Sequence, residues 1–162
     1  MKGLLLDAIT PLLTAIISLS ACRGNAQQAS AMMNEEHLKD NPYYSRTDTS
    51  PLHVSNAEWK KILSPELYRV AREQGTERAF TGKYWDSDTK GTYYCAVCGN
   101  KLFRSDAKFA SSCGWPSFFE ASRPDAVIYK DDNSFGMSRT EVECARCHSR
   151  LGHIFDYGPA PT

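Results

Sequence analysis

Four of the six cysteines form two Cys-x-x-Cys pairs, Cys95 with Cys98 and Cys144 with Cys147. Two thiolates separated by two residues can turn both sulfur atoms toward one tetrahedral ion, and two such pairs complete a four-cysteine zinc site. Gly99 follows the first pair and gives the backbone the freedom that this turn requires. The 45 residues between the pairs exceed the spacing of a common zinc ribbon, about 15–20 residues. The pattern therefore predicts a structural zinc that holds a whole domain together, with disulfides or a redox dithiol as alternatives.

A further thiol, Cys113, lies in the sequence SSCGWPSF of residues 111–118. Gly114 and Pro116 favour a turn that fixes the position of Trp115. A thiol beside a rigid indole suits chemistry on a small apolar group, although a buried core pair of Cys and Trp is the alternative. The loop position favours the functional interpretation.

Two histidines follow the second cysteine pair. His148 lies beside Cys147 and could compete as a metal ligand, although a solvent-exposed neighbour is the commoner case. His153, in the sequence LGHIF, is a candidate acid or base because imidazole titrates near neutral pH. A core histidine with satisfied hydrogen bonds is the alternative for this residue.

Residues 1–22 have the features of an export signal. Lys2 gives a positive start, and the apolar stretch that follows is too short and too polar for a secure transmembrane helix. The end of the segment, Leu-Ser-Ala-Cys22, resembles the bacterial lipobox, in which the cysteine after the cleavage site carries lipid. An ordinary signal peptide is the alternative. We expect a signal peptide over 1–21, a lipidated Cys22 with a flexible linker over 22–54, and an exported protein anchored to the periplasmic or extracellular side of a membrane.

Composition narrows the classes of function. A length of 162 residues fits one domain with appendages. The 19 basic and 19 acidic residues cancel, which argues against broad, non-specific binding to nucleic acid. Removing a lipidated Cys22 from the six cysteines leaves five, an odd number that argues against a complete disulfide framework.

Local signals predict two short helices followed by β structure over residues 55–162. Ser55 and Ser64 occupy N-cap positions, and Gly75 is expected to cap the second helix. After Gly75, short β-prone runs alternate with turn residues. These runs cover residues 92–94, 102–103 and 127–129, Val142 with its neighbours, and residues 154–155. We expect a mainly β, largely antiparallel domain with short N-terminal helices.

Several segments in order carry a more specific resemblance. They are residues 75–80 (GTERAF), 82–85 (GKYW), 94–99 (YCAVCG), 102–103 (LF), 113–118 (CGWPSF), 139–142 (RTEV), 144–147 (CARC), 151–155 (LGHIF) and 158–162 (GPAPT). From about Trp59 to Thr162 the sequence resembles the B-type peptide methionine sulfoxide reductases, which reduce the R epimer of methionine sulfoxide. The resemblance implies a β fold of two small antiparallel sheets, with a structural zinc away from the active site.

The resemblance also implies a thiol mechanism. A cysteine thiolate attacks the sulfoxide sulfur and becomes a sulfenic acid, a second cysteine converts this acid to a disulfide, and a thioredoxin-like donor reduces the disulfide. By position, Cys113 matches the resolving cysteine, Trp115 the indole that holds the S-methyl group, and His153 a residue that orients water or donates toward the sulfoxide oxygen. Phe118, in the same loop as Cys113, is assigned to substrate binding with Trp115 and His153. The matching zinc ligands are Cys95, Cys98, Cys144 and Cys147.

Three positions depart from the family pattern. The family continues with Gly-x-Arg-Tyr-Cys-x-Asn, which contains the nucleophilic cysteine, whereas this sequence stops at Thr162, about five residues before that cysteine. We expect a fragment whose residues 1–162 have little or no turnover. Tyr157 stands where the family commonly has Asp, with Asp156 one residue earlier, and Arg150 stands where it often has His.

The expected function is therefore reduction of protein-bound methionine-R-sulfoxide, with oxidised proteins or peptides and an exported thioredoxin-like reductant as partners. A non-catalytic, zinc-stabilised lipoprotein domain is the alternative. A zinc module that binds nucleic acid would need a basic surface, which a net charge of zero does not provide.

Overall fold

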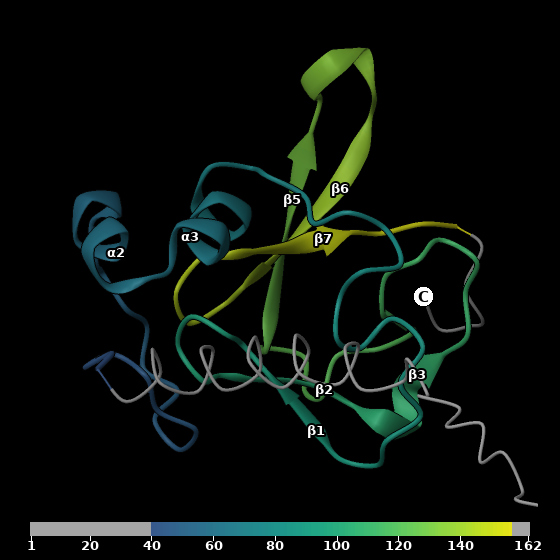
Figure 1. Cartoon of the computed structure of the whole chain (residues 1–162), viewed down its shortest axis with the longest axis horizontal. Helices are drawn as coiled ribbons and strands as arrows, with labels where there is room; N and C mark the ends of the chain where they lie inside the picture. The colour runs from purple at the N-terminus through teal and green to yellow at the C-terminus, as the bar shows by residue number, and fades with distance from the viewer. Residues whose placement is uncertain (1–39, 157–162) are drawn as a thin grey trace, which may run out of the picture. The chain divides into compact units, whose positions relative to one another are not determined.

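The computed structural model describes residues 40–156 (Figure 1). Two short helices come first, α2 (Asn56–Ile62) and α3 (Pro65–Arg72). The strands are β1 (Thr92–Tyr94), β2 (Lys101–Arg104), β3 (Lys108–Phe109), β4 (Ser117–Phe118), β5 (Val127–Asp132), β6 (Arg139–Cys144) and β7 (Arg150–His153), with short 3-10 turns η1 (Ser105–Ala107) and η2 (Ser134–Gly136). The predicted mainly β class with short N-terminal helices is confirmed. Cys22 and Tyr157 lie outside the described residues.

The helices begin where the capping pattern predicts. Ser55 and Ser64 each accept a hydrogen bond through Oγ from the backbone N–H three residues on, at 3.2 and 3.3 Å. The end of α3 differs from the prediction, because Gln74 and not Gly75 has the positive φ, 59°. Gly75 is needed for another reason: a Cβ there would lie 2.5–2.9 Å from atoms of Arg69.

The strands pair in three small antiparallel sheets, β1–β2, β3–β4 and β5–β6–β7. Figure 1 shows the β5–β6 hairpin extending away from β1 and β2. On β6, alternation places Arg139, Glu141 and Glu143 on one face, and β5 and β7 flank this strand. The strand predicted at residues 154–155 lies beyond the end of β7, although the Ile154 N–H still donates to the Thr140 carbonyl at 2.9 Å.

The buried core joins the helices to the sheets. It includes the side chains of Trp59, Leu63, Tyr68, Val97, Leu102 and Val127 together with the four paired cysteines. Within the described part of the chain, no helix is long and apolar enough to cross a membrane.

Residues 41–52 lie against the cysteine pairs. The Asn41 side chain donates to the Val97 carbonyl at 2.8 Å, and the Leu52 N–H donates to the Arg146 carbonyl at 2.7 Å. The buried guanidinium of Arg146 donates to the Tyr43 carbonyl at 2.8 Å and pairs with Asp48 at 2.9 Å. This stretch, which precedes the expected start of the domain at Ser55, is therefore tied to the second Cys-x-x-Cys turn.

Candidate functional site

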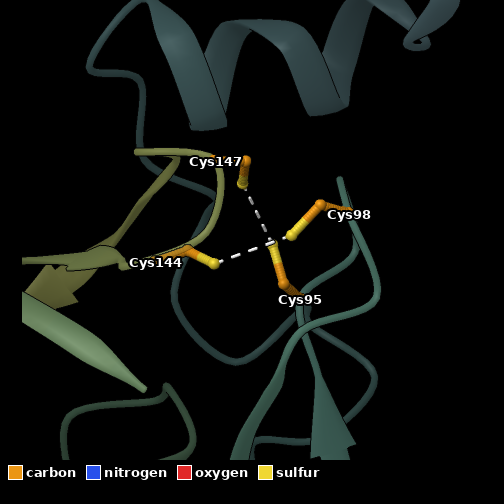
Figure 2. A group of neighbouring side chains, drawn as sticks. All are labelled: Cys95, Cys98, Cys144 and Cys147. Atoms are coloured by element: carbon orange, nitrogen blue, oxygen red, sulfur yellow. Dashed lines mark hydrogen bonds between the residues drawn. The ribbon is translucent and has the colours of Figure 1, made fainter. Parts of the chain in front are cut away.

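The four paired cysteines converge from two distant segments (Figure 2). Cys95 and Cys98 come from the turn after β1, and Cys144 and Cys147 from the end of β6 and the turn that follows it. All four side chains point toward one another, and the residues are 0–2% exposed. The Sγ atoms of Cys95 and Cys147 lie 3.7 Å apart, as do those of Cys98 and Cys144. The two predicted pairs therefore form one cluster.

The two turns have the same backbone geometry. In each, the residue after the second cysteine has a positive φ, 78° for Gly99 and 56° for His148, and donates its N–H at 2.8 Å to the carbonyl of the first cysteine. His148 is not part of the cluster, because its Nδ1 faces a Glu143 oxygen at 3.6 Å and its side chain is half exposed. His148 is therefore a neighbour of the four cysteines and not a fifth ligand of their site.

The donor set fits a tetrahedral zinc ion. With Zn–S bonds of about 2.3 Å, the sulfurs of a tetrahedral site lie about 3.8 Å apart, and the 3.7 Å separations match this edge. None of the four cysteines forms a disulfide. The hydrogen bond from Cys147 lowers the pKa of Cys144, whereas the same contact raises the pKa of Cys147. A divalent cation would allow all four thiols to ionise.

The loop that carries Cys113 is held by short polar contacts. The Sγ of Cys113 lies 2.9 Å from the Ser111 hydroxyl and 3.6 Å from the Ser117 hydroxyl, and these two hydroxyls are 2.7 Å apart. The Trp115 indole N–H donates to the Glu77 carbonyl at 3.0 Å. Both Cys113 and Trp115 are half-buried, so the thiol and the indole share one partly accessible loop.

Phe80 supports this loop and was not singled out from the sequence. Its backbone N–H donates to the Gly114 carbonyl at 2.8 Å, and its side chain meets Trp85 edge-on with ring centroids 5.3 Å apart. Gly114 has a φ of 80°, and a Cβ there would lie 2.8–2.9 Å from Phe80 atoms. Phe80 itself has a φ of 65°, a conformation that no sequence signal predicts for a bulky residue.

Phe118 belongs to an aromatic cluster. Its ring stacks on Phe103 with centroids 4.4 Å apart and meets Tyr93 edge-on at 4.8 Å. These contacts account for the position of Phe118 as part of the packing between β1–β2 and β3–β4. Its role in substrate binding stays a prediction.

His153 lies at the end of β7, on a different sheet from Cys113. Its Nε2 is 2.7 Å from Oδ2 of Asp132, and the two side chains are 8% and 13% exposed. Asp132 also accepts from Arg139 at 2.7 Å and from the Ser134 N–H at 3.0 Å. The hydrogen bond from the Ser134 hydroxyl, followed by that from His153, holds the pKa of Asp132 well below its ordinary range.

Arg150 begins β7, the strand that ends at His153. Its Nε lies 3.6 Å from Glu141, and its guanidinium donates to the Gln74 carbonyl at 2.6 Å. Arg150 therefore ties β7 to the end of α3. Asp132, Arg139 and Glu141 were not proposed as site residues from the sequence. The alternation of charged residues along β6 was the available signal, but it could not indicate which charges face His153.

These features define a class of protein. It is a small β domain in which two Cys-x-x-Cys turns bring four cysteines together, and a separate loop carries a thiol and an indole. Comparison with known proteins makes the class specific. The model of the SelR domain family matches residues 63–162. The chain belongs to this family, that of the B-type methionine sulfoxide reductases.

The similar proteins come from several organisms. The peptide methionine sulfoxide reductase MsrB of Thiobacillus denitrificans is 57% identical over 108 residues, which cover 67% of this chain and 82% of the relative. The protein of the same name from Agrobacterium fabrum is 53% identical over 115 residues, 70% of this chain and 85% of the relative. That from Methanosarcina barkeri is 54% identical over 108 residues, 67% and 76% of the two chains.

Proposed function

We propose that this protein reduces methionine sulfoxide in oxidised proteins or peptides, with preference for the R epimer. Family membership supports the reaction class. The observation that carries the proposal is the loop in which the Cys113 thiol lies 2.9 Å from the Ser111 hydroxyl, with the anchored indole of Trp115 two residues on. This thiol is not one of the four clustered cysteines, so its redox chemistry would not compete with metal binding there.

The proposed reaction has three steps. A cysteine supplied by a segment after Thr162 attacks the sulfoxide sulfur as a thiolate; the S–O bond breaks, the oxygen passes to the cysteine as a sulfenic acid, and methionine leaves. Cys113 then gives up its thiol proton and its sulfur attacks the sulfenic acid; the S–O bond breaks, a disulfide forms, and the oxygen leaves as water with that proton. A thioredoxin-like dithiol reduces the disulfide and is itself oxidised.

The remaining residues of the proposed site bind and orient the substrate. The Trp115 ring gives the S-methyl group an apolar surface, and its hydrogen bond to Glu77 fixes the ring plane. His153 supplies a proton toward the sulfoxide oxygen, a role suited to imidazole near neutral pH.

A zinc ion held by Cys95, Cys98, Cys144 and Cys147 would contribute stability and not chemistry. All four ligand positions of a tetrahedral site are taken by protein sulfur, so no position is left for a substrate. We further propose that the protein is exported and anchored through a lipid on Cys22, which would make an exported thioredoxin-like protein its reductant. A non-catalytic zinc-stabilised domain is the alternative.

The test uses a chain that includes the expected Gly-x-Arg-Tyr-Cys-x-Asn segment after Thr162. Methionine release from the separate R and S sulfoxides is followed by chromatography with a thioredoxin-type donor. We expect turnover on the R epimer, and we expect Cys113→Ser to release about one equivalent and then stall at the sulfenic acid. Ser112→Ala, a change at the exposed neighbouring position, is the control and should turn over normally. Preference for the S epimer, or no release at all, would contradict the proposal.

A further inference from the structure

We propose that Asp132 is a positioning residue that acts through His153, holding the imidazole ring in place for proton delivery. The inference deepens the proposed function and rests on it. It starts from the 2.7 Å contact between Nε2 of His153 and Oδ2 of Asp132.

The contact spans the central strand of the three-stranded sheet. Asp132 ends β5 and His153 ends β7, with β6 between them. Neighbouring strands lie about 4.8 Å apart, so the two backbones are about 10 Å apart and the side chains meet above β6. Both side chains are largely buried, which leaves little water to compete for the hydrogen bond.

Asp132 is itself fixed by β6 and by the hairpin turn. Arg139, its direct partner in the β5–β6 register, donates to Oδ2 at 2.7 Å, and the Ser134 N–H donates to Oδ1 at 3.0 Å. Arg139 also donates to the Ser134 hydroxyl at 3.1 Å. A carboxylate held through both oxygens cannot turn away, so it fixes the ring that bonds to it.

Four charged groups lie around His153. Asp132 faces it from β5, and Glu141 faces it from β6 in the direct register position. Arg139 on β6 pairs with Asp132, and Arg150 on β7 lies 3.6 Å from Glu141. The two guanidinium groups balance the two carboxylates, so Asp132 remains an ionised hydrogen-bond acceptor for the ring.

The same groups argue against a second metal site. The ligand atoms of Asp132, Glu141 and His153 lie within 4.8 Å of one another, as a metal would require. However, Arg139 and Arg150 already supply positive charge to the two carboxylates. The cluster therefore acts as a hydrogen-bonded ion network around one imidazole.

Because Nε2 of His153 bonds to Asp132, Nδ1 is the ring nitrogen that can donate to the substrate. Within residues 40–156, the hydrogen bonds of the His153 ring are made through Nε2 alone. With Nε2–H donated to Asp132, a proton on Nδ1 of the imidazolium is the one that can pass to the sulfoxide oxygen. After transfer, the ring stays in place as the neutral Nε2–H tautomer.

The experiment combines nuclear magnetic resonance with kinetics on the extended chain. In the wild type we expect a slowly exchanging Nε2–H resonance from His153, lost in Asp132→Ala and retained in Asp132→Asn, whose side chain oxygen still accepts. General acid catalysis is worth about 10²–10⁴-fold, so we expect Asp132→Ala to lower kcat at least about tenfold with little change in KM. In Asp132→Asn, which keeps an acceptor for the Nε2–H, kcat should stay close to the wild-type value.

Asp131→Asn is the matched control, because it removes the same charge from an exposed neighbour that faces the other side of the sheet. It should leave the resonance and kcat unchanged. An absent or Asp132-independent Nε2–H resonance overturns the proposal, as does an active wild type whose kcat does not respond to Asp132→Ala. An extended wild type that fails to reduce either epimer contradicts the proposed function instead, and the resonance still tests the Asp132–His153 contact.

Discussion

The indole N–H of Trp115 donates a hydrogen bond to the backbone carbonyl of Glu77, 38 positions earlier in the chain and 3.0 Å away. Glu77 lies between α3 and β1, in a stretch without regular helix or strand. The orientation of the proposed methyl-binding ring therefore depends on a loop far from it in sequence.

Trp115→Phe tests this dependence. The variant keeps an aromatic surface but loses the donor, so we expect a loss of about 1 kcal/mol in stability and in sulfoxide binding, equivalent to about a fivefold rise in KM. Trp115→Ala should cost more, because it also removes the apolar surface. Urea unfolding and steady-state kinetics measure the two effects. A Trp115→Phe variant with unchanged KM would show that the hydrogen bond does not orient the ring.

Gly114 and Gly136 form a matched pair for testing the thiol loop. Both have positive φ, 80° and 70°, but a Cβ on Gly114 would meet Phe80 at 2.8–2.9 Å whereas one on Gly136 meets nothing within 4 Å. We expect Gly136→Ala to cost about 1–2 kcal/mol through its backbone alone. Gly114→Ala should cost more and should change the rate at which Cys113 is alkylated. Equal stability loss with unchanged alkylation would contradict the packing described for Phe80.

Metal content tests the cysteine cluster. The purified domain should hold about one zinc per chain, because four thiolates complete a closed tetrahedral site. Cys147→Ser should lose the metal and unfold or aggregate, since site formation is coupled to folding. Cys113→Ser removes a thiol outside the cluster and should keep the zinc. Elemental analysis provides the measurement, and metal-free protein with disulfides among the four cysteines would refute the assignment.

His148→Gly should stabilise the protein. His148 holds a φ of 56° in the second Cys-x-x-Cys turn, where the first turn has Gly99. Relieving this left-handed conformation is worth about 1 kcal/mol after the greater freedom of unfolded glycine is subtracted. His148→Ala removes the same imidazole without relieving the backbone and serves as the control. Equal unfolding midpoints for the two variants would mean that the backbone is not strained there.

Acid should weaken the Asp132 network. The pKa of this carboxyl is held below its ordinary range. The carboxylate therefore stabilises the fold above about pH 4, the ordinary pKa of an Asp side chain. This stabilisation disappears as the pH falls toward the lowered pKa. Asp132→Asn should therefore be less stable than the wild type at pH 6, and the difference should narrow below pH 4. Urea unfolding at both pH values gives the comparison; a constant difference would show that the carboxylate charge contributes nothing.

The sequence predicted those features of the fold that depend on residues close together in the chain. The caps at Ser55 and Ser64 and the two Cys-x-x-Cys turns follow from residue type and short spacing. The pairing of Asp132 with His153 does not, because it depends on the register of three strands and on a span across β6. Phe80 was missed for a different reason: a bulky residue with positive φ is exceptional, and its partner Gly114 is distant in sequence.

Arg146 lies within the second Cys-x-x-Cys turn, and its guanidinium holds the Tyr43 carbonyl and Asp48. The second Cys-x-x-Cys turn thus also fastens residues 41–52, which lead into the domain. Loss of a metal from the four cysteines would loosen this turn and release residues 41–52 with it. Proteolytic cutting between residues 41 and 52 would then report metal loss.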